Sequence, residues 1–281
     1  MSRIALLGTG LLGSGMVQHF LRTGTVVTVW NRTASKARAL EKAGARVAAS
    51  PQEAVAGADR VHFVLPDDTV VNDILQQIGS ALKPDAIVVD HSTTLPEATA
   101  ARAEQLRAKG IRYVHAPVFM SPQMAADGVG LMLVSASRAD FDAVRPALEE
   151  MTGEVWYLGE RPDVAAAYKL FGNCMLFAIT GGLADVIAMA RANAIDPVDA
   201  LSVFQKFQAG NIIAGRGPRM ARGETTPASF AVEMARKDVA LMMAAAKDQP
   251  LVALPCIARR MDAVIQSGRG DHDLAALGPV T

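Results

Sequence analysis

The feature that most constrains this chain is a glycine-rich segment close to its start, Gly8-Thr9-Gly10-Leu11-Leu12-Gly13. The mostly apolar run Arg3–Leu7 precedes it, as expected for a parallel strand buried on both faces. Ser14–Arg22 follows with apolar residues at helical spacing and ends at Gly24. A chance glycine-rich turn is the alternative, but the flanking strand and helix favour a dinucleotide-binding turn. In such a turn the glycines allow a tight bend, close approach of a pyrophosphate and close helix packing.

The end of the second predicted strand bears on which dinucleotide is bound. Val26–Trp30 is followed by Asn31-Arg32-Thr33, with Lys36 about one turn later. NAD sites usually have an acidic residue here that holds the ribose 2′-hydroxyl, and that carboxylate would repel a 2′-phosphate. A guanidinium can bind the phosphate through two hydrogen bonds, although Arg32 as an ordinary surface residue remains the alternative. We therefore predict that NADP(H) is preferred over NAD(H), with Asn31, Arg32, Thr33 and Lys36 among the cofactor-binding residues.

Two further strands are predicted to bring loops to the same sheet edge. Val61–Leu65 is followed by Pro66, and Ala86–Asp90 is followed by His91-Ser92-Thr93-Thr94. Ligands of open α/β sheets bind at the carboxyl ends of the strands. We therefore place Leu65, Pro66, Ser92 and Thr93 at the cofactor. The alternative for this loop is a helix cap, with Thr94 before Leu95-Pro96-Glu97.

Strands and helices alternate through the first part of the chain and then the pattern changes. This alternation predicts a Rossmann domain with a doubly wound, mostly parallel sheet and a late extension. No convincing strand follows Gly159, so we predict an all-helical second domain and divide the chain into residues 1–161 and 162–281. The late strands are expected at 113–118, 131–135 and 155–158, with an irregular stretch before Gly130. The helices of the second domain are expected at 164–194, 197–207, 212–221, 231–247 and 255–266.

Composition limits the possible partners and cellular location. The 28 basic residues balance the 28 acidic ones, which gives no electrostatic argument for nucleic acid or an anionic membrane. Cys174 and Cys256 do not make a disulfide framework, and no basic segment precedes the first strand. The longest uncharged apolar stretch, Leu170–Ala184, is shorter than the ~20 residues that span a bilayer. We expect a soluble, cytoplasmic protein, and the five histidines show no metal-ligand spacing.

The predicted long helix carries the best acid/base candidate. Lys169 and Asn173 are four residues apart and share one helix face, while their neighbours are apolar. A buried lysine needs a polar partner, whereas a solvated stripe with an extended lysine is the alternative. A second pair, Lys237-Asp238, reads by itself as an ordinary charge pattern on a helix surface.

Together these motifs resemble the β-hydroxyacid dehydrogenase family, which includes 3-hydroxyisobutyrate dehydrogenase, tartronate semialdehyde reductase and the cofactor domain of 6-phosphogluconate dehydrogenase. The resemblance covers essentially the whole chain. It implies that Lys169 is the catalytic lysine and Asn173 a substrate ligand. It also implies that Lys237 lies beside the nicotinamide and that Ser92 and Thr93 line the cofactor site. The motifs that carry the resemblance are Gly8–Gly15, Asn31–Thr33, Leu65-Pro66, Asp90–Thr93, His115–Val118, Lys169 with Asn173, and Lys237-Asp238 with Leu241.

One loop departs from the family pattern. In the family Ala-Pro-Val is followed by Ser-Gly-Gly, whose hydroxyl and amides hold the substrate carboxylate. This chain has Phe119-Met120-Ser121, followed by Pro122 and Gln123. We predict that Phe119, Met120, Ser121, Gln123 and Asn173 contact a substrate other than the usual small hydroxyacids.

The resulting hypothesis is an NADP(H)-dependent dehydrogenase or reductase that acts on CH–OH groups of a small-molecule substrate, with Lys169 as general acid or base and without a metal. An imine reductase that uses the same hydride donor is the nearest alternative, and a non-catalytic NADP-binding scaffold or sensor is a more distant one. The Ala- and Met-rich helical half predicts a homodimer or homotetramer, as the resemblance also implies.

Overall fold

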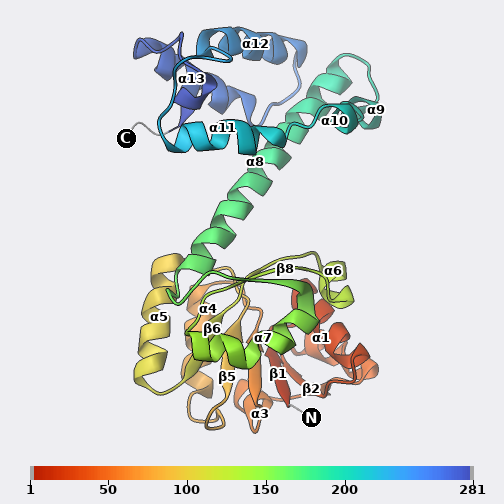
Figure 1. Ribbon diagram of the computed structural model, residues 1–281. Coiled ribbons are helices and arrows are strands. Elements are labelled where there is room, and N and C mark those ends of the chain that lie inside the picture. Colours follow the sequence, from red (N-terminus) through yellow and green to blue (C-terminus); the bar gives the residue numbers. More distant parts are fainter. Residues whose placement is uncertain (1–2, 279–281) are drawn as a thin grey trace. The chain divides into compact units, whose positions relative to one another are not determined.

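The computed structural model describes residues 3–278, and the chain forms two compact units whose boundary in the sequence lies between Asn173 and Cys174 (Figure 1). The sequence pattern placed the domain boundary after Arg161 instead. The two positions differ because the first turns of α8 (Val164–Ala192) pack on the N-terminal unit. There, Ala165 is fully buried and its amide donates to the Ser135 hydroxyl at 2.9 Å.

The N-terminal unit is built on a six-stranded sheet in which every neighbouring pair is parallel, in the order β3-β2-β1-β4-β5-β6. The strand order reverses between β1 and β4, which start the two halves of the sheet. This arrangement confirms the predicted doubly wound fold and places the carboxyl ends of β1, β2, β4 and β5 along one edge. The strands are β1 (Ile4–Leu7), β2 (Val27–Trp30), β3 (Arg46–Val47), β4 (Arg60–Phe63), β5 (Ile87–Asp90) and β6 (Arg112–His115).

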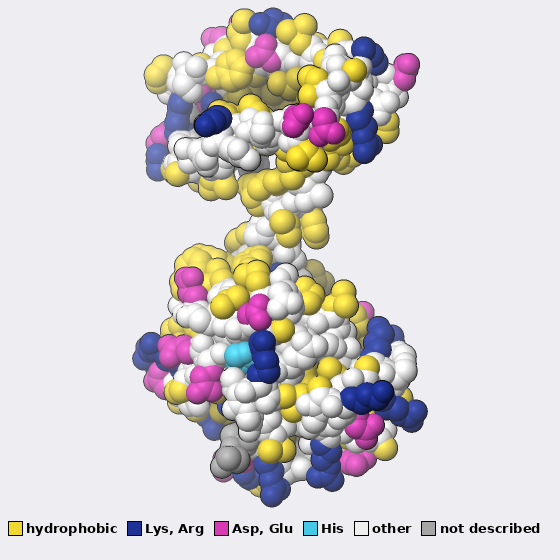
Figure 2. Space-filling model, turned by 90° about the vertical axis from the view of Figure 1, so that its right-hand side faces the viewer, with side chains coloured by type: hydrophobic (Ala, Val, Ile, Leu, Met, Phe, Trp, Pro, Cys, Tyr) yellow, Lys and Arg dark blue, Asp and Glu magenta, His cyan; other side chains and the backbone are white. Residues whose placement is uncertain are grey.

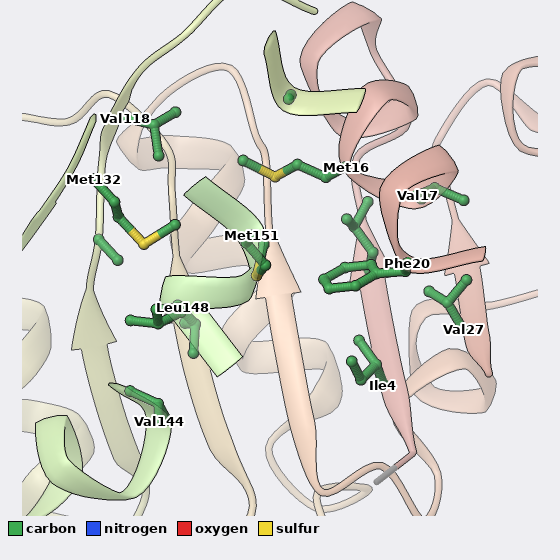
Figure 3. Packing of buried hydrophobic residues seen from close by; sticks show 14 of the residues in the cluster. Ile4, Met16, Val17, Phe20, Val27, Val118, Met132, Val144, Leu148 and Met151 are labelled. Atoms are coloured by element: carbon green, nitrogen blue, oxygen red, sulfur yellow. The ribbon is translucent and has the colours of Figure 1, made fainter. Parts of the chain in front are cut away.

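Helices cover both faces of this sheet, and alternate residues of β1 show the division. Ile4 and Leu6 belong to a buried cluster with α1 and α7, whereas Ala5 and Leu7 belong to a cluster with α3, α4 and α5. Figure 3 shows Phe20 of α1 above Ile4 in the first cluster. Burial on both faces explains why the strands are continuous apolar runs. The helices are α1 (Leu11–Arg22), α2 (Ala34–Arg38), α3 (Pro51–Val55), α4 (Asp68–Ile78), α5 (Pro96–Ala108) and α7 (Arg138–Thr152).

A second, three-stranded sheet completes the N-terminal unit. Its middle strand β8 (Gly130–Val134) pairs in antiparallel register with β7 (Val118–Phe119) and in parallel register with β9 (Gly153–Tyr157). The segment before Gly130, expected to be irregular, contains β7 and also a short helix, α6 (Pro122–Asp127). Ser121 caps this helix, because its hydroxyl accepts the Met124 amide at 3.2 Å.

The C-terminal unit is helical, as predicted. The expected helix over residues 197–207 divides in two at Ser202. Asp185 of α8 accepts hydrogen bonds from the amides of Val252, Ala253 and Leu254, and these bonds fix the start of α13. The elements after α8 are α9 (Pro197–Leu201), α10 (Val203–Lys206), α11 (Asn211–Ala221), α12 (Val232–Ala245), α13 (Leu254–Gln266) and a closing 3-10 turn (Leu274–Leu277).

Helix α8 is the one helix of the described residues that is long and apolar enough to cross a membrane. The same length and composition also suit a helix that packs against protein. Several of its apolar side chains, Phe177 and Ile179 among them, are more than half exposed in the single chain. Apolar side chains also show as yellow areas on the surface of both units (Figure 2). The apolar sequence of this continuous helix is interrupted by polar side chains, among them Lys169, Asn173 and Asp185.

Candidate active site

The glycine-rich turn joins β1 to α1, and its glycines have different geometric reasons to lack a side chain. Gly8 has φ of +104°, a left-handed conformation, and a Cβ there would lie 2.1 Å from the Val64 carbonyl oxygen. A Cβ on Gly13 would lie 2.0 Å from the Gly8 carbonyl oxygen. A Cβ on Gly10 would meet no atom within 4 Å, so the space beside it is open. The turn is therefore tightly packed towards the sheet and open on the outside.

The start of α1 has the properties of an anion site. Gly10 is its N-cap, no side chain caps the helix, and its first turn contains no acidic residue. The first amides of a helix have no partner within it, and the helix dipole adds partial positive charge at this end. The turn therefore fits a dinucleotide pyrophosphate.

A cavity of about 640 Å³ opens beside this turn, entirely within the N-terminal unit. It brings together most of the residues predicted for the cofactor and adds side chains from α4, among them Asp73 and Gln77. Its volume lies within the range of small-molecule and cofactor sites. The predicted residues that line it are Gly8, Gly10, Leu11, Leu12, Asn31, Arg32, Thr33, Lys36, Leu65 and Pro66.

Asn31 and Arg32 take different parts in this cavity. The Asn31 side-chain oxygen accepts the Thr9 amide at 3.0 Å, and its NH₂ group donates to the Thr33 carbonyl at 3.1 Å. Asn31 therefore ties the glycine turn to the end of β2. No ion pair among the described residues engages Arg32, which is exposed. Its guanidinium is free to bind a phosphate.

The loops after β4 and β5 are joined through Ser92. Its hydroxyl accepts the Leu65 amide at 2.9 Å, and its own amide donates to the Asp90 carboxylate at 2.9 Å. Ser92 is buried, whereas Thr93 is exposed at the same edge. Ser92 thus holds the loop, and Thr93 is the hydroxyl open to a ligand.

The helix-cap interpretation of Thr94 is wrong. The N-cap of α5 is Leu95, which makes no side-chain cap. Thr94 is buried instead, and its hydroxyl bonds to that of Thr99 at 2.7 Å. The Leu95 amide is bound by the Asp68 carboxylate, which comes from α4 and has no signal in the local sequence.

A chain of hydrogen bonds that the sequence did not reveal lies beneath these loops. Arg60 Nε donates to His62 Nε2 at 2.8 Å, so His62 carries its proton on Nδ1 and donates to His91 Nε2 at 2.9 Å. His91 then donates from Nδ1 to the Ala116 carbonyl at 2.7 Å. Both rings are neutral in this arrangement, which links β4, β5 and the segment after β6.

Burial keeps three histidines of the N-terminal unit neutral. It lowers the pKa of His62 well below its usual value, lowers that of His91, and lowers that of His115 to about 4. Below its ordinary pKa of 6.5, each histidine takes up a proton more readily in the unfolded chain than in the folded unit. Folding stability is therefore expected to fall as the pH drops from about 6.5 towards 4.

His115 alone is expected to contribute about 2 kcal/mol to the loss between pH 7 and pH 5, since pH 5 lies about 1.5 units below its ordinary pKa and each unit corresponds to about 1.4 kcal/mol. The measurement is urea unfolding at pH 7 and pH 5, followed by tryptophan fluorescence. Both tryptophans, Trp30 and Trp156, lie in the N-terminal unit. A His115→Asn variant should show a weaker pH dependence. Equal stability at the two pH values would contradict the assignment of neutral buried histidines.

Lys169 is half-buried in the first turns of α8, with two neighbours from β7. Its Nζ donates to the Val118 carbonyl oxygen at 2.7 Å and lies 4.2 Å from the centre of the Phe119 ring. Burial lowers the pKa of the Lys169 ammonium. A lysine with these contacts is not part of a solvated stripe. Asn173 lies one turn further along α8 and is also partly buried.

The remaining predicted residues lie in two other places. Lys237 is on α12 of the C-terminal unit, is exposed, and has the Asp238 carboxylate 3.3 Å from its Nζ. Gln123 donates to the Asp127 carboxylate at 2.9 Å on the exposed face of α6. The Ser121 hydroxyl is used as the cap of the same helix. Met120 packs against the main core cluster of the N-terminal unit.

Both units match known sequence families. Residues 3–159 match the family described as the NAD binding domain of 6-phosphogluconate dehydrogenase. Residues 164–280 match the family described as NAD-binding of NADP-dependent 3-hydroxyisobutyrate dehydrogenase. The chain belongs to the β-hydroxyacid dehydrogenase family. The resemblance drawn from the motifs is thereby confirmed, and the chain is an NAD(P)-dependent oxidoreductase of that family.

The individual relatives share less than a third of their residues with this chain. The chain is 28% identical to glyoxylate/succinic semialdehyde reductase 1 of Arabidopsis thaliana over 281 residues, which cover 98% of this chain and 96% of the relative. It is 29% identical to cytokine-like nuclear factor N-PAC of Aedes aegypti, covering 94% of this chain and 48% of that longer protein. The imine reductase from Myxococcus stipitatus in complex with NADP+ has a TM-score of 0.88 at 20% identity, with 98% of each chain covered. That last likeness shows the fold alone.

Proposed function

We propose that this protein is an NADP(H)-dependent reductase or dehydrogenase that interconverts a small carbonyl compound and its alcohol. The observation that carries the proposal is Lys169, an ammonium group taken partly out of water and held by a backbone carbonyl. Such a lysine suits proton transfer to an alkoxide or from a hydroxyl group. The Arabidopsis relative is named a glyoxylate/succinic semialdehyde reductase, which agrees with carbonyl chemistry of this kind.

Different residues of the N-terminal unit would bind the cofactor and transfer the proton. The bound cofactor would supply or accept the hydride. The amides at the start of α1 would hold its pyrophosphate, and Arg32 its 2′-phosphate. In reduction, the Lys169 ammonium would give a proton to the oxygen of the forming alcohol, and Asn173 would orient that oxygen through a hydrogen bond. In oxidation, neutral Lys169 would take the hydroxyl proton, and the lowered pKa favours that neutral form.

The loop after Val118 indicates the substrate class. A carboxylate needs hydrogen-bond donors, but the Phe119 side chain has none and Pro122 has no amide proton. The Ser121 hydroxyl accepts the Met124 amide as the cap of α6 and keeps one O–H to donate, whereas the Gln123 amide group already donates to Asp127. A poorly paired carboxylate in a pocket is costly. We therefore infer that the substrate carries an apolar group where small hydroxyacids carry a carboxylate.

This inference predicts a substrate preference. The value of kcat/KM should be higher for an aldehyde or ketone with an apolar substituent than for tartronate semialdehyde, and higher for the matching alcohol than for 3-hydroxyisobutyrate. Replacing Phe119 with Ser and Met120 with Gly together should move the ratio of kcat/KM values towards the acids, because a hydroxyl and approachable amides return. A native preference for a small hydroxyacid would show that other donors have rebuilt the carboxylate site.

One assay separates this function from its alternatives. NADPH oxidation is followed with short aldehydes, ketones and preformed cyclic imines at equal concentrations. The proposal predicts turnover of carbonyl compounds well above that of imines. The imine reductase alternative, favoured by a fold shared with such enzymes, predicts the reverse order. Binding of NADPH without turnover of any compound would favour the scaffold or sensor.

We also propose that the protein is a cytoplasmic homodimer or homotetramer that assembles through its helical unit. Several large apolar side chains of that unit are more than half exposed in the single chain, and packing two copies would bury them. The face of α8 would then contact protein instead of lipid. Examples of these side chains are Phe177, Ile179, Ile212, Ile213 and Leu241.

Light scattering at micromolar concentration tests this assembly. The single chain has a mass of 29.6 kDa, so a dimer or tetramer should appear at two or four times that value. A particle of the single-chain mass would contradict the proposal. A Phe177→Ser/Ile179→Ser double variant should shift the population towards the monomer.

A further inference from the structure

The aromatic ring of Phe119 is matched to a glycine on α8. Lys169 and Gly172 are three residues apart, so they lie on the same face of that helix. A Cβ on Gly172 would lie 2.2 Å from Cζ and 2.6 Å from Cε1 of the Phe119 ring. The lysine Nζ lies 4.2 Å from the centre of the same ring. One ring thus fills the space of a missing side chain and also contacts the ammonium group.

The backbone conformation does not explain why residue 172 is a glycine. Gly172 lies inside a continuous helix and is absent from the positions with positive φ. Glycine in a helix interior is about 1 kcal/mol less favourable than alanine. A Cβ at this position would therefore have to displace the Phe119 ring. The nearby Gly182 of α8 differs, because a Cβ there would meet nothing within 4 Å.

The ring also determines what the lysine can bind. An ammonium has three N–H donors, and the Val118 carbonyl takes one of them. The Phe119 ring covers a second side and excludes water from it, in a cation–π contact. β7 and the following Met120-Ser121 contain no charged side chain, and burial alone accounts for the lowered pKa of Lys169. One donor remains for a single oxygen atom of a ligand.

We propose that Phe119, seated against Gly172, is a positioning residue that holds the Lys169 ammonium on the Val118 carbonyl and leaves it one donor for a neutral oxygen acceptor. The role of that acceptor as a substrate carbonyl rests on the proposed function. The seating of the ring and its effect on the lysine do not. The pair also explains why an aromatic residue stands where a hydroxyl would bind a carboxylate.

The test compares three variants in the protein without substrate or cofactor. Gly172→Ala pushes the ring off the helix, Phe119→Leu removes it, and the third variant combines both changes. The rate at which acetic anhydride acetylates Lys169 is measured against pH by mass spectrometry of the peptide that contains it. Exposed Lys109 in the same sample serves as the reference. The midpoint of the curve is used because it does not depend on accessibility.

In the native protein the Lys169 midpoint should lie below the ordinary lysine value of about 10.4. Gly172→Ala should raise it by about one pH unit, because the return of water to that side of the ammonium outweighs the lost cation–π contact. This rise corresponds to about a tenfold lower neutral fraction near neutrality. Phe119→Leu should raise the Lys169 midpoint by a similar amount. Adding Gly172→Ala to Phe119→Leu should change the midpoint little further. Gly182→Ala is the matched control and should leave the midpoint unchanged. Thermal unfolding of each variant verifies that it is folded.

An unchanged midpoint in folded Gly172→Ala, or the same shift with and without Phe119, would overturn the proposal. Turnover is measured separately with an apolar aldehyde, and its pH profile should move in the same direction as the labelling curve. A labelling shift without turnover on any carbonyl compound would sink the proposed function and leave the positioning role intact. Turnover on carbonyl compounds with an unchanged labelling curve would overturn the positioning role and leave the proposed function intact.

Discussion

Replacing Lys169 with methionine is expected to lower NADPH turnover by at least about two orders of magnitude while the cofactor still binds. Methionine keeps roughly the bulk of the side chain and removes the charge and the proton. The Val118 carbonyl loses its donor, but residue 169 is not among those that line the cavity beside the glycine turn. The loss should therefore fall on kcat and leave the Kd of NADPH nearly unchanged.

A matched variant makes the result interpretable. Lys109 is exposed at the end of α5, and Lys109→Met should keep native turnover. Stopped-flow single-turnover experiments separate the chemical step from product release. Near-native turnover in Lys169→Met would show that the lysine is not the proton donor and that the mechanism is wrong.

Replacing Arg32 with alanine is expected to weaken NADPH binding about ten- to a hundredfold and NADH binding far less. A charge-assisted contact to phosphate contributes roughly 1.5–3 kcal/mol, and only NADPH has the 2′-phosphate to lose. Arg32 lines the cavity beside the glycine turn, and Asn31 is already engaged with the Thr9 amide. The guanidinium is therefore the main candidate at this end of the cavity, with Lys36 beside it.

Isothermal titration with both cofactors gives the two affinities directly. Arg38→Ala, which removes another exposed arginine from α2 outside the cavity, is the matched control and should alter neither affinity. Equal weakening of NADPH and NADH in Arg32→Ala would exclude Arg32 as the phosphate ligand. The proposed preference for NADP(H) would then need another cause.

The fold could be predicted because its signals are local. The strand before Gly8, the turn and the helix after it follow from adjacent residues, and the same holds for each later strand. Gly8 is an example of such a local signal, since its positive φ is a property of the turn itself. The short helix α6 lies where the sequence pattern predicts an irregular stretch, although Ser121-Pro122 is a good helix start.

The site depends on contacts that sequence spacing does not reveal. Lys169 and the Val118 carbonyl are 51 residues apart, and nothing near Lys169 identifies its acceptor. The bond between His62 and His91 joins β4 to the residue that follows β5, and the pairing of these two strands has to be known first. Thr94 illustrates the same limit, because local capping rules favoured a role that tertiary contacts replaced. Gly172 in an apolar helix gave no sign of its match with Phe119.

The central claim is hydride transfer from NADPH to a carbonyl carbon, and isotope transfer tests it most directly. The protein is incubated with NADPH deuterated on both positions of nicotinamide C4 and with an apolar aldehyde, and the product is analysed by mass spectrometry. The account predicts an alcohol with one deuterium on the carbinol carbon, and no such product with Lys169→Met over the same time. Alcohol without deuterium, or no alcohol from any aldehyde or ketone while NADPH binds, would contradict it.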